Sequence, residues 1–453
     1  MRIIKLLIIS SILFMGISAS AQEHQLTLKE SIGYGLNNHS SIFIGKNRIE
    51  MAKEKKRETL AAYLPQVNIS STLDANLKVQ STYFPAIPIT LPNGETFSMG
   101  GGPVAFGQKY NSSITAQLDQ QLYNQQILVG LKAAEPNNRL AEQTFEQTRQ
   151  NLIYNIAYAY YQIIIAQKRI ELLNANIARY QELLRVVNLR EEQGVATKVD
   201  VSQTRLNLNN ILSQLEIAKN TYQVALNSFK TNVGINQSTS VALADTSRWL
   251  NRMPDEVFMP DFEYSNSIEK KLQETQIELL QLNKENIKAE AFPSLGFYAR
   301  YGFNGFGDKL GQAFDPLYNF SSVGIRLAWN PFSGFGRDAR YKQANYEYLN
   351  AVESLKLNEQ LQNLQFQNSK TQLLSAYNTI TVNRQNLALA QEVYNNTNLQ
   401  YKQGVAQLSD LLNVEMSMWT AQNNYMQSLL DFYIAELELN KANGTLYQYY
   451  QNL

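Results

Sequence analysis

The sequence predicts a mainly α-helical protein in which one plan occurs twice, each time as a pair of β-strands joined to a very long helical hairpin. Three observations predict this fold class. Long segments contain no helix breaker, the same pattern returns about 210 positions later, and four runs alternate between apolar and polar residues. A repeat of this length indicates internal duplication of a whole architectural unit.

The first long helix is expected from Asn137 to Gln193, about 57 residues that include neither Gly nor Pro. Apolar residues fall alternately four and three positions apart along it, which is the pattern of a coiled-coil seam. The seam consists of Leu152, Ile156, Ala159, Ile163, Ala166, Ile170, Leu173, Ile177, Tyr180, Leu184 and Val187. At about 1.5 Å per residue this helix would be roughly 85 Å long. The seam stops at Gly194-Val195-Ala196 and resumes from Leu208 to Phe229, so the chain is expected to turn back on itself.

The second half of the sequence contains a matching hairpin. Gly404-Val405-Ala406 repeats the first turn, and Asp410 stands where the first hairpin has Asp200. Between Gly336 and Gly404 there is again no Gly or Pro, but the seam is interrupted by the polar residues Ser369, Asn383 and Thr397. We therefore expect two long antiparallel hairpins, the second with the less apolar seam.

Residues 1–21 have the features of a secretory signal peptide. Arg2 and Lys5 precede an apolar stretch from Leu6 to Met15, and Ala19-Ser20-Ala21 offers a small-x-small cleavage site. The apolar stretch is too short to span a bilayer, so a retained membrane anchor is the less favoured alternative. Because the chain has no Cys, a lipid-modified N-terminus of the bacterial lipoprotein kind is excluded.

The composition excludes several classes of function. The absence of Cys removes disulfides and thiolate metal sites, and the only histidines are His24 and His39. We therefore expect no metal site. Removing Arg2 and Lys5 with the signal peptide leaves 38 basic against 39 acidic residues, which gives no reason to expect nucleic acid as a partner. The mature sequence has no apolar window long enough for a transmembrane helix.

Four segments alternate with a period of two, as β-strands with one apolar and one polar face do. They lie at Val67–Val79, Ser113–Leu122, Leu295–Asn304 and Ser322–Asn330. Residues from Ser81 to Tyr110 are rich in Pro and Gly and are expected to form an irregular loop. Pro136 should stand either in the first turn of the long helix or at a kink.

Four strands raise a choice between a soluble sandwich and a membrane barrel. A sandwich needs a second layer over its apolar face, yet the helices are committed to their own seams. Four strands are also too few to close a barrel, for which about eight is the working minimum. An oligomer is therefore expected. Three copies would supply twelve strands, although a dimer or a tetramer would satisfy the same reasoning.

These elements divide the chain as follows: signal peptide 1–21, first repeat 22–234, equatorial connector 235–266, second repeat 267–444 and C-terminal tail 445–453. The first repeat is expected to hold a helix, a strand pair at about 66–124 and a helical hairpin at about 127–233. The second is expected to hold a helix, a strand pair at about 294–330 and a hairpin at about 335–443. The tail is expected to pack loosely.

The order of these features resembles the TolC family of outer-membrane efflux proteins. The resemblance is carried by the signal peptide, the tandem units, the corners Leu64-Pro65 and Phe292-Pro293, and the two Gly-Val-Ala turns. It implies a homotrimer with a twelve-stranded barrel in contact with outer-membrane lipid and a coiled-coil α-helical tunnel in the periplasm. It also implies an exit duct that works with a periplasmic adaptor and an inner-membrane pump of RND, ABC or MFS type, with no catalytic residue, no enzyme activity and no cofactor.

The resemblance further implies a periplasmic gate near the helix turns. By matching position, Asp410 would form a ring of carboxylates, and Tyr401 would join a hydrogen-bonded latch with Asp200. Two positions depart from the family pattern: Asn413 replaces a second acidic residue, and Ala406 replaces a latch arginine. We therefore expect one carboxylate per copy in the ring and a weaker latch.

Simpler roles remain open for the same residues. Thr197 followed by Asp200 has the spacing of a capping box, and an acid there also favours the helix dipole. Gly194, Val195, Ala196, Gly404, Val405 and Ala406 are either adaptor-facing tips or plain tight turns in which Gly adopts a left-handed conformation.

Three alternatives to an efflux duct also remain. The first is an outer-membrane channel of type I protein secretion, which the sequence does not separate from efflux of small molecules. The second is a periplasmic coiled-coil scaffold, which would need no barrel. The third, a barrel enzyme, is the least favoured because His24 and His39 lie away from every expected strand.

Overall fold

The computed structural model describes residues 24–252, 261–262 and 264–453, so the expected signal peptide and part of the connector lie outside the described residues. Contacts divide the chain into two compact units. The helical unit comprises Met1–Ile49, Leu140–Glu274 and Glu353–Leu453, and the sheet unit comprises Glu50–Arg139 and Thr275–Val352. Among the described residues, no helix combines the length and the apolar character needed to cross a membrane.

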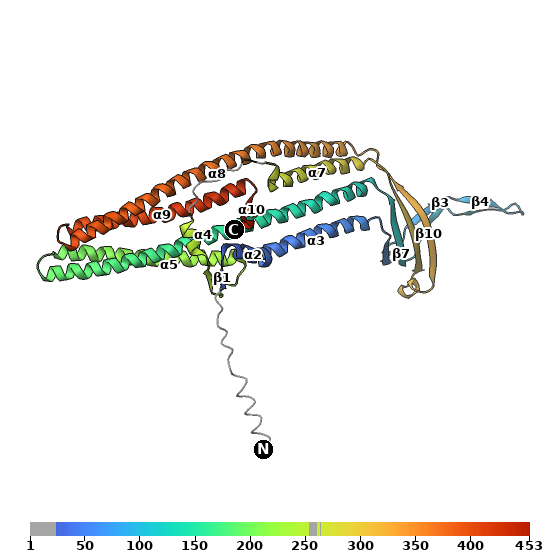
Figure 1. The fold of residues 1–453 in the computed structure, drawn as a ribbon. Helices are drawn as coiled ribbons and strands as arrows, with labels where there is room; N and C mark the ends of the chain where they lie inside the picture. The colour runs from blue at the N-terminus through green and yellow to red at the C-terminus, as the bar shows by residue number, and fades with distance from the viewer. Residues whose placement is uncertain (1–23, 253–260, 263) are drawn as a thin grey trace, which may run out of the picture. The chain divides into compact units, whose positions relative to one another are not determined.

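Two helical hairpins dominate the helical unit. α4 (Gln125–Glu192) is followed by α5 (Lys198–Val233), and α8 (Gly336–Lys402) by α9 (Leu408–Ala442). Figure 1 shows the partners of each hairpin side by side. Pro136 lies inside α4, so the alternative that placed it in the first turn is wrong. A helix of 68 residues can lose one backbone hydrogen bond to proline and still continue.

The expected seams hold each hairpin together. In the first hairpin, Leu173, Ile177 and Tyr180 of α4 pack against Leu208, Leu215 and Ala218 of α5. In the second, Tyr394 and Tyr401 of α8 pack against Leu411 and Met418 of α9. Burying one such side chain contributes roughly 1.5–3 kcal/mol, so these rows can hold helices of this length together.

The main core of the helical unit lies further along the same helices. Aromatic side chains are concentrated there, with Tyr160, Tyr161, Phe229, Trp249 and Tyr433 all fully buried. Shorter elements cover this core: α2 (Leu28–Asn38), α6 (Thr246–Asn251) and the first strand β1 (His24–Leu26), which pairs in parallel with β8 (Val241–Leu243). The connector therefore supplies both a strand and a helix to this core.

The C-terminal segment does not pack loosely, and that expectation was wrong. It forms α10 (Leu446–Gln451), in which Leu446 is 1% exposed. The hydroxyl groups of Tyr449 and Tyr161 share a hydrogen bond across 288 positions of sequence. The tyrosine-rich end is thus part of the core, because each ring brings a large apolar surface and a hydroxyl that finds a partner.

The sheet unit contains one antiparallel four-stranded sheet in the order β10-β9-β7-β2. The strands are β2 (Gln66–Ala75), β7 (Tyr110–Tyr123), β9 (Ser294–Gly307) and β10 (Leu317–Ala328). Several large apolar side chains on one face are more than half exposed, namely Val67, Ile69, Val323, Ile325 and Leu327. β2 and β10 are the edge strands, and the outer edge of each has no partner strand within the described chain. An exposed apolar face and two free edges fit a sheet that is completed by other copies and by lipid.

Three helices flank these strands in sequence. α3 (Ser40–Ala61) leads into β2, α7 (Ile268–Ala289) leads into β9, and a short helical turn, η2 (Leu310–Ala313), lies between β9 and β10. In the sheet unit, Arg139 of α4 forms an ion pair with Glu278 of α7 and donates from Nε to Thr275 Oγ1 at 3.4 Å. These contacts attach α7 to α4 beside the sheet.

Residues 81–105 were expected to be irregular, and this expectation was also wrong. They form two small antiparallel ladders, β3 (Ser81–Phe84) with β6 (Gly102–Ala105), and β4 (Ile87–Thr90) with β5 (Thr96–Met99). The turn contains Gly94, whose φ of 85° is left-handed. Prolines are tolerated because every strand of a two-stranded ladder has a free edge and can do without one donor. The β2–β7 hairpin therefore ends in a long arm.

Candidate functional site

The candidate site lies at the turns of the two helical hairpins, within the helical unit. Both turns close in the same way: Val195 N donates to Arg190 O at 2.8 Å, and Val405 N donates to Gln400 O at 2.9 Å. Gly194 and Gly404 have φ angles of 75° and 80°, a left-handed conformation that Gly adopts without steric cost. The turns therefore require glycine for local geometry, whatever else they do.

The valine of each turn is exposed. Val195 is 73% and Val405 75% exposed, so both turns present an apolar side chain to the surroundings. Ala196 and Ala406 follow, and their amide groups complete the turns by donating to Arg190 O and Gln400 O. The six tip residues thus form two similar small apolar protrusions.

The first candidate gate acid, Asp200, caps a helix. Its Oδ2 accepts from the amide and the hydroxyl of Thr197, each at 2.8 Å, and its own amide donates to Thr197 Oγ1 at 3.2 Å. The capping box expected from the sequence is therefore present. Capping does not exclude a gate role, which remains a prediction.

The second candidate acid, Asp410, occupies the equivalent position in the second hairpin. Its Oδ2 accepts from the amide of Gln407 at 3.1 Å, and the side chain is exposed. Asn413 is exposed one turn further along α9, and its carbonyl accepts from the Ser417 hydroxyl at 2.9 Å. One carboxylate per chain is thus available at this level of α9.

The buried tyrosine of the candidate latch contacts an arginine rather than an aspartate. Tyr401 is 4% exposed, and the guanidinium of Arg190 lies 4.3 Å from the centre of its ring. Arg190 Nη2 also donates to the carbonyl of Tyr401 at 3.0 Å. The hydrogen bonds of the described residues include none between Tyr401 and Asp200. Burial raises the pKa of Tyr401, the charge of Arg190 opposes this shift, and the charge of Asp200 adds to it.

Sequence reasoning did not single out Arg190, because the family pattern places the latch arginine at the position that Ala406 occupies here. Arg190 is on the other hairpin, four residues before Gly194, whereas Tyr401 stands three residues before Gly404. The sequence did offer one indication of this contact, because Arg190 and Tyr401 precede their turns by a similar number of residues. Together they join the C-terminal end of α4 to that of α8.

A second polar contact joins the hairpins further from the turns. Arg179 Nε of α4 lies 3.5 Å from Glu415 Oε1 of α9, and the Arg179 guanidinium lies 5.4 Å from the centre of the Tyr394 ring. Glu415 is 5% exposed. Burial raises the pKa of Glu415, while Arg179 and a hydrogen bond from Tyr394 oppose that shift. A buried charge is tolerated here because an arginine compensates it.

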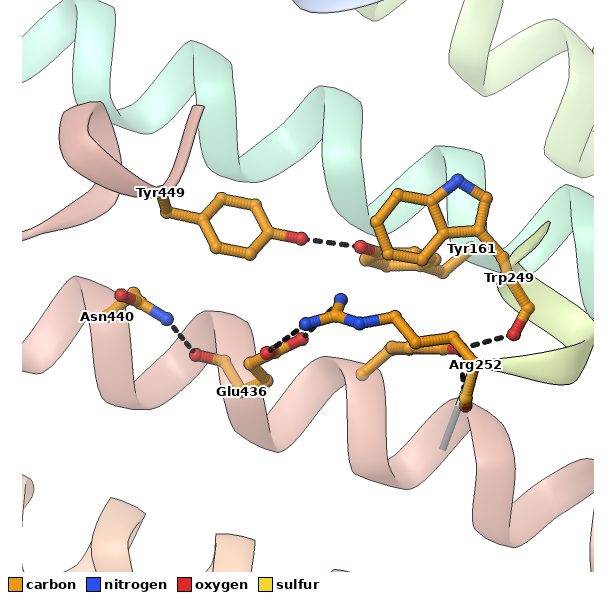
Figure 2. A network of polar contacts seen from close by, with 7 residues as sticks. Tyr161, Trp249, Arg252, Glu436, Asn440 and Tyr449 are labelled. Atoms are coloured by element: carbon orange, nitrogen blue, oxygen red, sulfur yellow. Dashed lines mark hydrogen bonds and ion pairs between the residues drawn. The ribbon is translucent and has the colours of Figure 1, made fainter. Parts of the chain in front are cut away.

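A third polar network lies in the main core (Figure 2). The two terminal nitrogens of Arg252 donate to the Glu436 carboxylate at 3.0 and 3.3 Å. Burial raises the pKa of Glu436, and the arginine opposes that shift. Above this pair the Tyr161 and Tyr449 hydroxyls meet, and the Tyr161 ring stacks on Tyr433 with centroids 4.4 Å apart. The network ties α4, α9, α10 and the connector into one piece.

In the described part of the chain, no group of three His, Cys, Asp or Glu side chains is placed to hold a metal ion. Long hairpins with paired apolar turns, and a sheet with open edges and an exposed apolar face, are the features of an outer-membrane channel protein. The chain belongs to the outer membrane efflux protein family, whose model matches residues 36–234 and 272–445.

Comparison with known proteins agrees with this assignment. The chain is 22% identical to the outer membrane protein TolC of Vibrio cholerae over 88% of its own length and 86% of that protein. It is 24% identical to the alkaline protease secretion protein AprF of Pseudomonas aeruginosa over 74% of its length and 70% of that protein. Among solved structures, CusC superposes with a TM-score of 0.69 at 15% identity, covering 95% of each chain. The outer-membrane channel OprN superposes with a TM-score of 0.68 at 14% identity, covering 92% of this chain and 90% of OprN.

The family and these folds settle the class of the protein. It is a non-enzymatic exit duct of the outer membrane, with its helical part in the periplasm. It acts as a homotrimer, each copy giving four strands to a barrel that the helices continue as a tunnel, together with an adaptor and an inner-membrane pump. The family model spans strands and hairpins alike, which leaves no support for a periplasmic scaffold without a barrel.

Proposed function

We propose that this duct passively conducts small molecules handed over by its pump and adaptor, and that it closes at the turns of its helical hairpins. A tube open at both ends would let the periplasm leak, so a closure is needed at the end opposite the barrel. The turns are the ends of the hairpins. We also propose that the chain is organised as two repeats, 22–234 and 267–444, joined by the connector 235–266.

The contact between Arg190 and Tyr401 carries the proposal. It links the first hairpin to the second beside both turns, through a hydrogen bond of 3.0 Å and a ring contact of 4.3 Å. A contact between hairpins in this position holds them together in the closed duct and must be released when they separate. Arg190 would thus supply, from the first hairpin, the latch cation that Ala406 does not provide.

Asp410 is proposed as the ring carboxylate of this gate. Asp410 is exposed near the turn, and only one of its carboxylate oxygens, Oδ2, accepts a hydrogen bond from the amide of Gln407. Three copies would bring three carboxylates together, and Asn413 would add hydrogen-bonding groups without charge. Asp200 would act indirectly, by fixing the start of α5 and through its charge near Tyr401.

The tips are proposed as the surface that the adaptor meets. Val195 and Val405 are about three-quarters exposed, and a paired apolar surface of this kind suits docking of another helical hairpin. A charged residue at either position should therefore weaken assembly with the adaptor without affecting the barrel.

Type I protein secretion is the second candidate, because AprF is named as a protease secretion protein and is 24% identical. Deletion of the gene separates the two functions. Hypersensitivity to dyes, bile salts or antibiotics with unchanged secreted proteins would support efflux of small molecules. Loss of a secreted protein without hypersensitivity would support secretion and refute the primary proposal.

A further inference from the structure

Two arginines on the polar face of the sheet have no role in the gate. Arg300 is on β9 and Arg326 on the neighbouring strand β10, at positions paired with Ser322 and Gly296. Both lie on the face opposite Val323, Ile325 and Leu327, because side chains alternate along a strand. The exposed apolar face contacts lipid in a barrel of this family, so the two arginines belong to the lumen.

Tyr298 holds the two arginines in one cluster. Its ring centre lies 5.1 Å from the guanidinium carbon of Arg300 and 5.3 Å from that of Arg326. The ring lies over Gly324, where an added Cβ would come within 2.7 Å of the Tyr298 hydroxyl and 2.8 Å of Cζ. Glycine at 324 therefore leaves the space that the ring occupies, and both guanidiniums gather around one aromatic platform.

Neither arginine is neutralised within the described chain. No ion pair or hydrogen bond of the described residues includes Arg300 or Arg326, and the Nε of Arg300 is buried without a partner. Asp119 is the carboxylate paired across the strands with Tyr298, but both its oxygens accept from Gln117 Nε2, at 2.7 and 2.9 Å. The two guanidiniums therefore keep most of their donors available for a solute.

The other acid on this face is far from the cluster. Asp74 is paired with Asn111, six residues along β7 from Gln117, the partner of Arg300. At about 3.3 Å per residue this is roughly 20 Å, beyond the screening length of about 8 Å at physiological salt. Locally each copy therefore has two guanidiniums against one carboxylate.

We propose that Arg300 and Arg326, gathered on Tyr298, form an anion-binding site in the barrel lumen, repeated in each copy as a ring. Its ligands are solutes with carboxylate, sulfonate or phosphate groups, which a planar guanidinium binds through two parallel hydrogen bonds. An aromatic part of the solute would stack on the guanidinium planes. This inference rests on the proposed function, because it names the class of solute that the duct favours.

The test uses purified wild-type trimers in planar bilayers and the planar trisulfonate pyranine, added on the barrel side. Wild-type channels should be blocked by pyranine, and the R300Q/R326Q variant should need at least about tenfold more pyranine for half block, since the loss of even one charged donor weakens binding by about that order. The chloride-to-potassium permeability ratio should fall in the same variant. K78Q/K109Q, which removes two cations beyond the outer ends of β2 and β7, is the matched control.

The outcomes separate the two proposals. Conducting wild-type channels whose pyranine block is the same in R300Q/R326Q would overturn the anion site and leave the duct intact. An equal loss of block in K78Q/K109Q would assign the effect to general charge and would also overturn the site. Wild-type trimers that form no channel would refute the proposed conduction itself. If the double variant does not assemble, R300Q and R326Q singly should each give an intermediate loss, and two unaffected single variants would refute the site.

Discussion

Replacing Arg190 by Met tests the proposed latch most directly. Methionine keeps the unbranched stem that packs along α4 but removes the guanidinium, and with it the 3.0 Å hydrogen bond to Tyr401 O and the contact with the Tyr401 ring. The buried tyrosine and both turns remain. We therefore expect folded trimers whose closed state is weakened.

The size of the effect follows from the two lost contacts. A hydrogen bond from a charged donor contributes about 1.5–3 kcal/mol, with the lower end appropriate for a partly exposed arginine. A cation over an aromatic ring at such a site adds about 0.5–1 kcal/mol. The sum is about 2 kcal/mol per copy, or roughly a 30-fold shift toward the open state if the contact exists only when the gate is closed.

Single-channel recording in planar bilayers measures this shift as open probability. Arg190→Met should increase it strongly, and Arg190→Lys should give an intermediate value because lysine keeps the charge but loses the planar fork. Arg185→Met is the matched control, since Arg185 is on the same helix but pairs with the exposed Glu182 one turn away. An open probability for Arg190→Met equal to that of the wild type would refute the latch.

Three further outcomes are expected. Asp410→Ala should raise the concentration of a trivalent cation needed for half block by about tenfold, whereas Asn413→Ala should change it little; equal effects would remove the carboxylate from the gate. Burial raises the pKa of Glu415, so this carboxylate binds a proton at a higher pH in the folded protein than in the unfolded chain. The contribution of Glu415 to the free energy of unfolding therefore grows as pH falls from its raised pKa toward the ordinary carboxyl pKa. The melting temperature of Glu415→Gln trimers should lack this pH dependence, and parallel pH profiles of the variant and the wild type would contradict it. Leu446→Ala should cost about 2–5 kcal/mol and lower the melting temperature clearly, while the same change at exposed Leu189 should not; equal melting of both variants would mean that α10 is not part of the core.

The long hairpins and the sheet could be predicted because their patterns extend over many residues. A seam held through several heptads rarely arises outside a coiled coil. Alternation over about ten residues indicates a β-strand and also which of its side chains share a face. The short elements could not be predicted in this way. The ladders of β3 to β6 are four residues each and contain Pro88 and Pro103, so composition indicated a loop.

The candidate site, too, could be predicted from the sequence only in part. The turns and the burial of Tyr401 follow from local sequence, because glycine spacing and the seam determine them. Arg190 was not found because its role depends on which hairpin lies beside it, and that is a tertiary contact between residues 211 positions apart. The Tyr298 cluster likewise depends on cross-strand register, which alternation alone does not determine.

The pairing of β1 with β8 has a consequence for biogenesis. His24 pairs with Val241, and Tyr161 meets Tyr449 of α10, so the first strand and the C-terminal helix are both needed to complete one core. A polypeptide exported with its N-terminus leading cannot bury that core until its final helix has crossed the inner membrane. Contacts of such long range form slowly. Until then the aromatic surfaces stay exposed, so we expect the nascent protein to be prone to aggregation and fragments lacking α10 to be sensitive to proteolysis.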